Sequence, residues 1–171
     1  MFAAFIAVCA WITIPVGVIP ITLQTFAVFL CAVTLGAKRG TLSVLVYILI
    51  GAVGVPVFSG FKGGIGTLLG ATGGYIVGFI FSAILTGILS EKFCKYSIIK
   101  NVLAMLAGLA VCYLFGTLWF MFVYTKSTEP THFISVMMKC VVPFILPDII
   151  KISLAAVLGT KLKKVLNNMP E

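Results

Sequence analysis

The chain has 171 residues, 61% of them hydrophobic and only 9% charged, and its formal net charge is +8 at pH 7. Soluble domains carry about 25% charged residues, so this composition indicates an integral membrane protein. The apolar runs are continuous rather than alternating, which argues against a membrane β-barrel. Their combined length leaves room for one all-α domain of roughly six helical spans.

Six spans are predicted within a single domain, residues 1–171. They cover approximately residues 2–14, 22–36, 41–57, 74–90, 101–124 and 147–164. The first run is short for a span, and we expect its helix to begin upstream of residue 1. A loop is expected at 15–21, because Pro15, Gly17 and Pro20 break helical structure there.

Two segments between the predicted spans have distinctive sequences. Residues 59–74, "SGFKGGIGTLLGATGG", are rich in glycine. Glycine permits close backbone approach to a ligand, so we interpret this segment as a flexible lid rather than a nucleotide-binding loop. Residues 133–144 are predicted to form a short interfacial or re-entrant helix. Pro147 is expected in the first turn of the sixth span, where a helix tolerates proline.

The basic residues predict the orientation in the membrane, because Lys and Arg gather on the cytoplasmic side. With the N-terminus inside, the outer segments hold only three of them, Lys62, Lys126 and Lys139. The inner loops then hold eight: Lys38, Arg39, Lys92, Lys95, Lys100, Lys161, Lys163 and Lys164. Both termini are therefore expected to be cytoplasmic, and the glycine-rich segment extracellular.

Asp148 and Lys151 stand three positions apart in the apolar stretch "FILPDIIKISL", near the outer end of the sixth span. Residues i and i+3 share one face of a helix, and a lone charge at mid-membrane costs about 2.5–3.5 kcal/mol. One interpretation is a pair that only neutralises itself, with Asp148 also favoured by the helix dipole. The other, which we favour, is a polar anchor inside a ligand cavity.

No enzyme is expected from the residues present. The one histidine, His132, lies in a predicted outer loop, so a histidine-based metal site or catalytic triad is not expected. The other acids, Glu91, Glu129 and Glu171, fall in loops or at the tail, and no P-loop motif occurs. The five scattered cysteines are expected to be small buried hydrophobes, and no cofactor is expected.

Small residues recur on one face of the first span, at Ala3, Ala7 and Ala10. A small-xxx-small face lets another helix approach closely in a membrane. The partner is either another span of this chain or a separate subunit, and the pattern alone does not choose between them.

Three segments resemble signature segments of the BioY family, and the likeness runs from about Pro20 to Ala156. They are "PITLQTFAVFLCAVTLGAKRGTLSVLVYILIGAVGVPVFSG", "GGIGTLLGATGGYIVGF" and "LPDIIK". "GATGG" stands where "GPTGG" is usual in the family. The resemblance implies a six-helix bundle in the bacterial cell membrane, the biotin-specific S component of an energy-coupling factor (ECF) transporter.

The resemblance also implies partners and a transport cycle. S components of this kind capture biotin from outside and work with a transmembrane coupling subunit and two ABC-type ATPases. The Ala3/Ala7 face resembles the AxxxA surface that docks on the coupling subunit. Ligand is expected to order the loops at 15–21 and 59–74, after which the coupling subunit topples the whole component.

Biotin offers a ureido ring with two N–H donors and a carbonyl, an apolar body, and a carboxylate. We expect Asp148 to accept from the ureido N–H groups and Lys151 to donate to the ureido carbonyl, because charge-assisted hydrogen bonds are strong. For the carboxylate, the candidates are Thr22, Gln24, Thr25 and the backbone of the glycine-rich segment, including Gly73 and Gly74. For the apolar body, the candidates are Tyr47 and Tyr75. Each tyrosine alone is more readily explained by packing than by ligand contact.

Three rival functions follow from the same sequence. An S component for thiamine, riboflavin or another vitamin would share the architecture and change the pocket. A membrane-embedded enzyme would need a catalytic set that the sequence does not offer. A structural scaffold would tolerate neutralisation of both Asp148 and Lys151.

Overall fold

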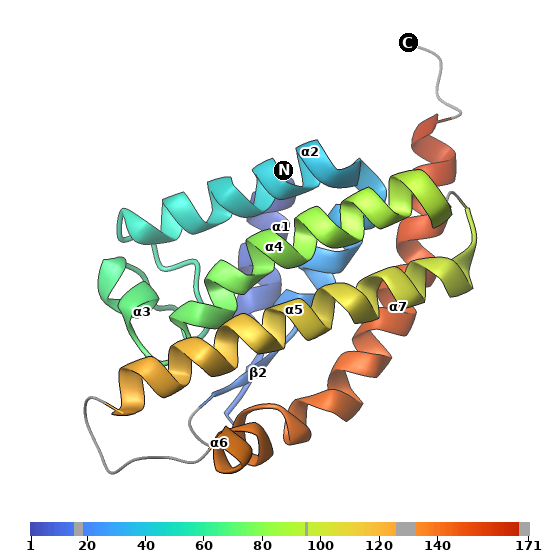
Figure 1. Cartoon of the computed structure of the whole chain (residues 1–171). Helices are drawn as coiled ribbons and strands as arrows, with labels where there is room; N and C mark the ends of the chain where they lie inside the picture. Colours follow the sequence, from blue (N-terminus) through green and yellow to red (C-terminus); the bar gives the residue numbers. More distant parts are fainter. Residues whose placement is uncertain (16–18, 95, 126–132, 168–171) are drawn as a thin grey trace.

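The computed structural model describes residues 1–15, 19–94, 96–125 and 133–167, and the fold is almost entirely helical (Figure 1). The helices are α1 Phe2–Trp11, α2 Gln24–Ala52, α3 Ile65–Leu69, α4 Gly73–Leu89, the π-helical turn η1 Ser90–Cys94, α5 Ile98–Thr125, α6 Phe133–Cys140 and α7 Val142–Asn167. Within the described residues, four helical segments are long and apolar enough to cross a membrane: Gln24–Ala52, Gly73–Cys94, Ile98–Val123 and Val142–Leu166.

Helix α2 is a hairpin of two helical halves rather than one straight rod. Gly36 interrupts it with φ 78° and ψ −175°. A Cβ on Gly40 would lie 3.0 Å from the Cα of Ala32, whereas eight residues of a straight helix span about 12 Å. Gln24 and Tyr47, at the far ends of the halves, are joined by a 2.8 Å hydrogen bond. The halves are therefore antiparallel, and they overlap the second and third predicted spans.

The break in α2 meets the ends of two other helices. The Glu91 carboxylate, in η1, accepts a hydrogen bond of 3.2 Å from the Ala37 amide, which satisfies a backbone donor at the start of the second half of α2. The Lys163 ammonium, near the end of α7, donates to the carbonyl and hydroxyl oxygens of Ser90, both at 3.1 Å. Three segments that the sequence predicts to be inner loops or ends thus converge at one end of the bundle (Figure 1).

Close helix packing builds the core around α2 and α4. Helix α4 packs chiefly on α5 and α2, α7 packs on α2 and α5, and α1 packs on α2. Gly78 allows α4 to approach the Cys112 backbone of α5, since a Cβ there would lie 3.2 Å from that Cα. The Ala3/Ala7/Ala10 face of α1 points into this core, with Ala7 6% and Ala10 0% exposed. In this arrangement the small-residue face packs inside the chain, and docking through it remains a prediction.

Three local features differ from the sequence-based expectations. Helix α1 ends at Trp11, and two short strands, β1 Thr13–Ile14 and β2 Ile21–Thr22, form an antiparallel pair on either side of the expected loop. Strands of two residues are too short to produce an alternating pattern. The expectation for Pro147 is wrong: α7 begins at Val142, so Pro147 lies inside it and Pro143 occupies the first turn. The helix dipole has its main effect in the first turn, and Asp148 consequently lies beyond its reach.

Candidate functional site

A cavity of about 140 Å³ is lined by residues at the start of α2 and α4 and in the first half of α7, whereas the break in α2 meets the other ends of α4 and α7. The cavity lies between β2, the start of α2, the loop before α3, and helices α4, α5 and α7. Its lining residues are Ile19, Pro20, Thr22, Gln24, Thr25, Phe58, Ser59, Lys62, Thr67, Thr72, Tyr75, Ile76, Phe79, Cys112, Tyr113, Cys140, Phe144, Asp148 and Lys151. Segments far apart in the sequence, from Ile19 to Lys151, therefore contribute to one site.

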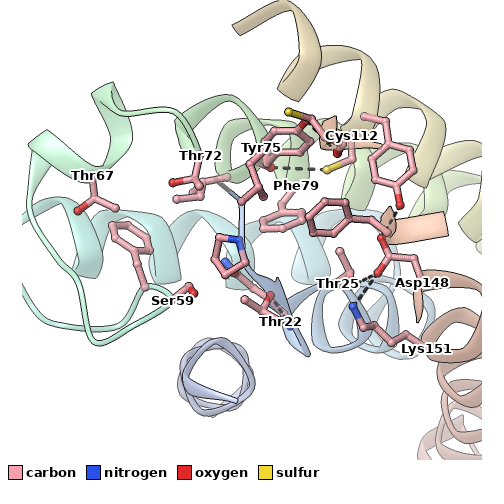
Figure 2. A pocket seen from close by; sticks show the side chains of 18 of the residues that line it. Thr22, Thr25, Ser59, Thr67, Thr72, Tyr75, Phe79, Cys112, Asp148 and Lys151 are labelled. Carbon is pink, nitrogen blue, oxygen red and sulfur yellow. Dashed lines mark hydrogen bonds and ion pairs between the residues drawn. The ribbon is translucent and has the colours of Figure 1, made fainter. Parts of the chain in front are cut away.

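Asp148 lies at the centre of a hydrogen-bonded group on one wall of the cavity (Figure 2). Its Oδ1 atom accepts from the Lys151 ammonium at 2.7 Å and from the Thr25 hydroxyl at 3.0 Å. Its Oδ2 atom accepts from the Tyr113 hydroxyl at 2.6 Å. We call these four residues the Asp148 cluster; it joins α2, α5 and α7.

Both charges of the Asp148 cluster are almost completely removed from the surface, with Asp148 3% and Lys151 7% exposed. Buried charges are tolerated only when they are paired and hydrogen-bonded. Here the pairing leaves capacity for a ligand. A carboxylate offers about four acceptor positions and an ammonium three donors, and the cluster uses three of the former and one of the latter.

The rest of the cavity is largely apolar. Its walls include Phe58, Ile76, Phe79 and Phe144. In Figure 2, Phe79 lies between Asp148 on one side and Thr67 and Thr72 on the other. An apolar cavity with a few convergent polar groups is the usual form of a small-molecule site. The arrangement suits a ligand with a polar, hydrogen-bonding head and an apolar body.

Most of the predicted substrate contacts meet in this cavity. Thr22, Gln24, Thr25, Tyr75, Asp148 and Lys151 all line it. The Thr22 hydroxyl accepts from the Gln24 amide nitrogen of the backbone at 3.2 Å, and the Tyr75 hydroxyl donates to the Cys140 carbonyl at 3.4 Å. Their roles toward a ligand remain predictions.

Tyr47, Gly73 and Gly74 are not among the described residues that line the cavity. The Tyr47 side chain is 1% exposed; its hydroxyl accepts from Gln24 and donates to the Val57 carbonyl at 3.2 Å. A Cβ on Gly74 would collide with Trp119 of α5, and one on Gly73 with the Leu68 backbone. These three positions are packed next to the site, where the Tyr47 hydroxyl holds Gln24, and their roles toward a ligand remain predictions.

Tyr113 is the main site residue that the sequence analysis missed. It stands in a 28-residue apolar helix, α5, and its hydroxyl is a polar group that must find a partner there. The same reasoning that selected Tyr47 and Tyr75 applies to it. Its pairing with Asp148, 35 positions away, depends on how α5 packs against α7 and has no local sequence signal.

Some predicted features fall on residues outside the described ranges. Lys126, Glu129 and His132 belong to this set, as do residues 16–18 of the expected loop and Lys95. All five cysteines lie in described segments and are buried, which confirms that they behave as small hydrophobes, and Cys112 and Cys140 line the cavity.

Comparison with known proteins shows the family. The model of the BioY family matches residues 1–168, and the chain belongs to that family. It is 46% identical to the biotin transporter BioY of Thermotoga maritima over 96% of this chain and 92% of that protein. It is 39% identical to a probable biotin transporter BioY of Pyrococcus horikoshii over 95% of this chain and 92% of that protein.

A solved structure has the same fold. The crystal structure of the S-component for biotin from an ECF-type ABC transporter superposes with a TM-score of 0.86, at 28% sequence identity, and covers 95% of this chain and 87% of that chain. The chain is therefore a helical, multi-pass membrane protein with the S-component fold, and the family resemblance inferred from its sequence is confirmed.

Proposed function

We propose that this chain is the biotin-binding S component of an ECF-type vitamin importer. The observation that carries the proposal is the Asp148 cluster: a buried ion pair with unused hydrogen-bonding capacity, set in the wall of an apolar cavity. The relatives named as biotin transporters and the solved biotin S-component support the same assignment. Capture of the vitamin and its coupling to transport are separate tasks, and this chain performs the first.

The ligand's chemistry matches the cluster group by group. The free acceptor position of Asp148 is on Oδ2, because Oδ1 already accepts from Lys151 and Thr25. That position takes a ureido N–H, and the remaining donors of Lys151 reach the ureido carbonyl, both as charge-assisted bonds. The thioether ring and the chain then lie along Phe79, Phe58 and Ile76, where they gain from burial of apolar surface.

Six spans with both termini in the cytoplasm fit this role. The hairpin form of α2 supplies two of the spans, and α1, α4, α5 and α7 supply the others. The predicted inner residues Lys38, Arg39 and Lys163 lie near the break in α2 and η1, and the cavity opens at the opposite end of the bundle. The positive-inside rule then turns the cavity outward, toward the vitamin that is to be captured.

Energy for transport comes from partner subunits in this proposal. The sequence carries no P-loop motif, and the relatives are named as transporters rather than enzymes. A transmembrane coupling subunit with two ABC-type ATPases completes the importer, as the ECF class of the solved S-component implies. Toppling of this chain against the coupling subunit delivers biotin to the cytoplasm.

Equilibrium binding of labelled biotin to the purified chain, in detergent or in nanodiscs, tests the proposal. We expect saturable binding of one biotin per chain, with no competition from excess thiamine or riboflavin. Thiamine is a cation, and the charged residues that line the cavity carry one net positive charge, so it is disfavoured there. Binding of either competitor in preference to biotin would assign the chain to another vitamin.

A further inference from the structure

The charges along the cavity are unevenly distributed. The described lining residues include one carboxylate, Asp148, and two ammonium groups, Lys151 and Lys62. Lys151 is neutralised by Asp148 at 2.7 Å, so that end of the cavity has no net charge. Lys62 makes no salt bridge to any described acidic residue, and it therefore supplies the net positive charge of the site.

Lys62 belongs to the end of the cavity away from the Asp148 cluster. The Phe58 amide donates to the Lys62 carbonyl at 2.9 Å, which pairs Lys62 with Phe58 across a tight turn that begins at Ser59. The Thr67 hydroxyl donates to the carbonyl of Gly63, the residue after Lys62, at 3.1 Å. Figure 2 shows Ser59 and Thr67 on the opposite side of the view from Asp148 and Lys151, so the loop that carries Lys62 faces the cluster across the cavity.

The turn that carries Lys62 is fixed on both sides. Gly60 and Phe61 take positive φ values of 70° and 56°, a conformation that reverses the chain within a few residues. The Phe61 ring stacks on Trp11 of α1 with 5.1 Å between ring centroids. Beyond the turn, the Gly64 amide donates to the Gly51 carbonyl at 2.7 Å. The backbone of Lys62 is thereby held at the cavity while its exposed side chain can reach a ligand.

We propose that Lys62 binds the carboxylate of the ligand and fixes the direction in which it lies. The inference rests on the proposed function, and it identifies the substrate class of this site as a monoanion with a neutral ureido head. The head is held at the Asp148 cluster, which has no net charge, and the carboxylate at Lys62. In the reverse orientation the ligand's carboxylate would lie against the Asp148 carboxylate and away from Lys62. That repulsion gives the site one preferred orientation.

The test compares biotin with biotinamide, which keeps the ureido head and lacks the negative charge. In the purified full chain, we expect Lys62→Met to weaken biotin binding about five- to tenfold and to leave biotinamide binding unchanged. The effect is moderate because Lys62 is exposed and such pairs are screened by water. Lys62→Arg should retain most of the affinity, and higher salt should weaken biotin binding to the unchanged chain more than to Lys62→Met.

Lys100→Met is the matched control, since Lys100 is also exposed and lies outside the cavity lining. It removes the same charge and should change neither affinity. Equal loss of biotin and biotinamide in Lys62→Met, or no loss of either, overturns the inference while leaving biotin binding itself established. Selective loss of biotin in Lys151→Met overturns it as well and reverses the orientation. Failure of the unchanged chain to bind biotin refutes both the proposed function and this inference.

Discussion

At the scale of single residues, Asp148 connects three helices through one carboxylate. Thr25 belongs to the first half of α2, Tyr113 to α5 and Lys151 to α7, and each donates a hydrogen bond to it. A group held from three sides cannot turn away easily when the cavity is empty. Its acceptor positions are therefore preorganised for a ligand, which reduces the entropy lost on binding.

Removal of one charge or of both should separate a structural role from a binding role. Asp148→Asn leaves the Lys151 ammonium buried without a counter-charge, and we expect a loss of about 3–5 kcal/mol in stability. The double variant Asp148→Asn/Lys151→Met removes both charges and should recover most of that stability. Thermal unfolding of the purified chain in detergent measures the difference.

Biotin binding should not recover in the double variant. We expect at least a hundredfold loss of affinity in both variants, because the charge-assisted hydrogen bond between a ureido N–H and the Asp148 carboxylate is absent in each. If the double variant instead bound biotin like the unchanged chain, the ion pair would be a structural device and the cavity would recognise its ligand by other groups.

The sequence predicts those contacts of the site that join residues close together on one helix. Asp148 and Lys151 are three positions apart on one helix, so their pairing follows from helix geometry alone and is found at 2.7 Å. Tyr113 and Lys62 reach the cavity only through the packing of α5 and the turn before α3. No pattern within a window of the sequence encodes such contacts.

At the scale of elements, Gly36 is the position on which the α2 hairpin depends. Its φ of 78° with ψ of −175° lies in a region that is essentially restricted to glycine, and a Cβ there would also collide with the Glu91 carboxylate. The sequence shows the two apolar runs on either side, which is why two helices are predicted. It does not show that the chain reverses at Gly36 through a single non-helical residue.

Gly36→Ala should destabilise the chain by about 1–3 kcal/mol from backbone strain alone, with a further loss from the collision. The additional substitution Glu91→Ala should relieve the collision and leave the strain, at the cost of the hydrogen bond to the Ala37 amide. Gly66→Ala is the matched control, because a Cβ on Gly66 in α3 meets nothing within 4 Å. Unfolding in detergent compares the three variants, and equal stability of Gly36→Ala and Gly66→Ala would contradict the hairpin at Gly36.

Pro147 shows why element boundaries are harder to predict than elements. The sequence offers two prolines, Pro143 and Pro147, either of which is compatible with the first turn of a helix. The structure begins α7 at Val142 and places Pro143 in that turn. The helix therefore runs through Pro147, and Asp148 gains its stability from side-chain partners rather than from the helix terminus.

At the scale of the whole molecule, the two ends of the bundle have different chemistry. One end gathers the break in α2, η1 and the end of α7, with Glu91 and Lys163 joining them through hydrogen bonds. The other end holds the two short strands and α6 (Figure 1), and residues of β2 and α6 contribute to the lining of the cavity. The count of basic residues predicts an orientation for this arrangement, whereas the association of distant segments around one cavity emerges only from the folded chain.

A structure of the chain with biotin bound tests the account most directly. The ureido ring should lie within about 3 Å of both the Asp148 carboxylate and the Lys151 ammonium, with the ligand's carboxylate directed toward the turn that carries Lys62. A bound biotin whose ureido ring touches neither Asp148 nor Lys151, while those two groups contact only each other and the neighbouring helices, would contradict it.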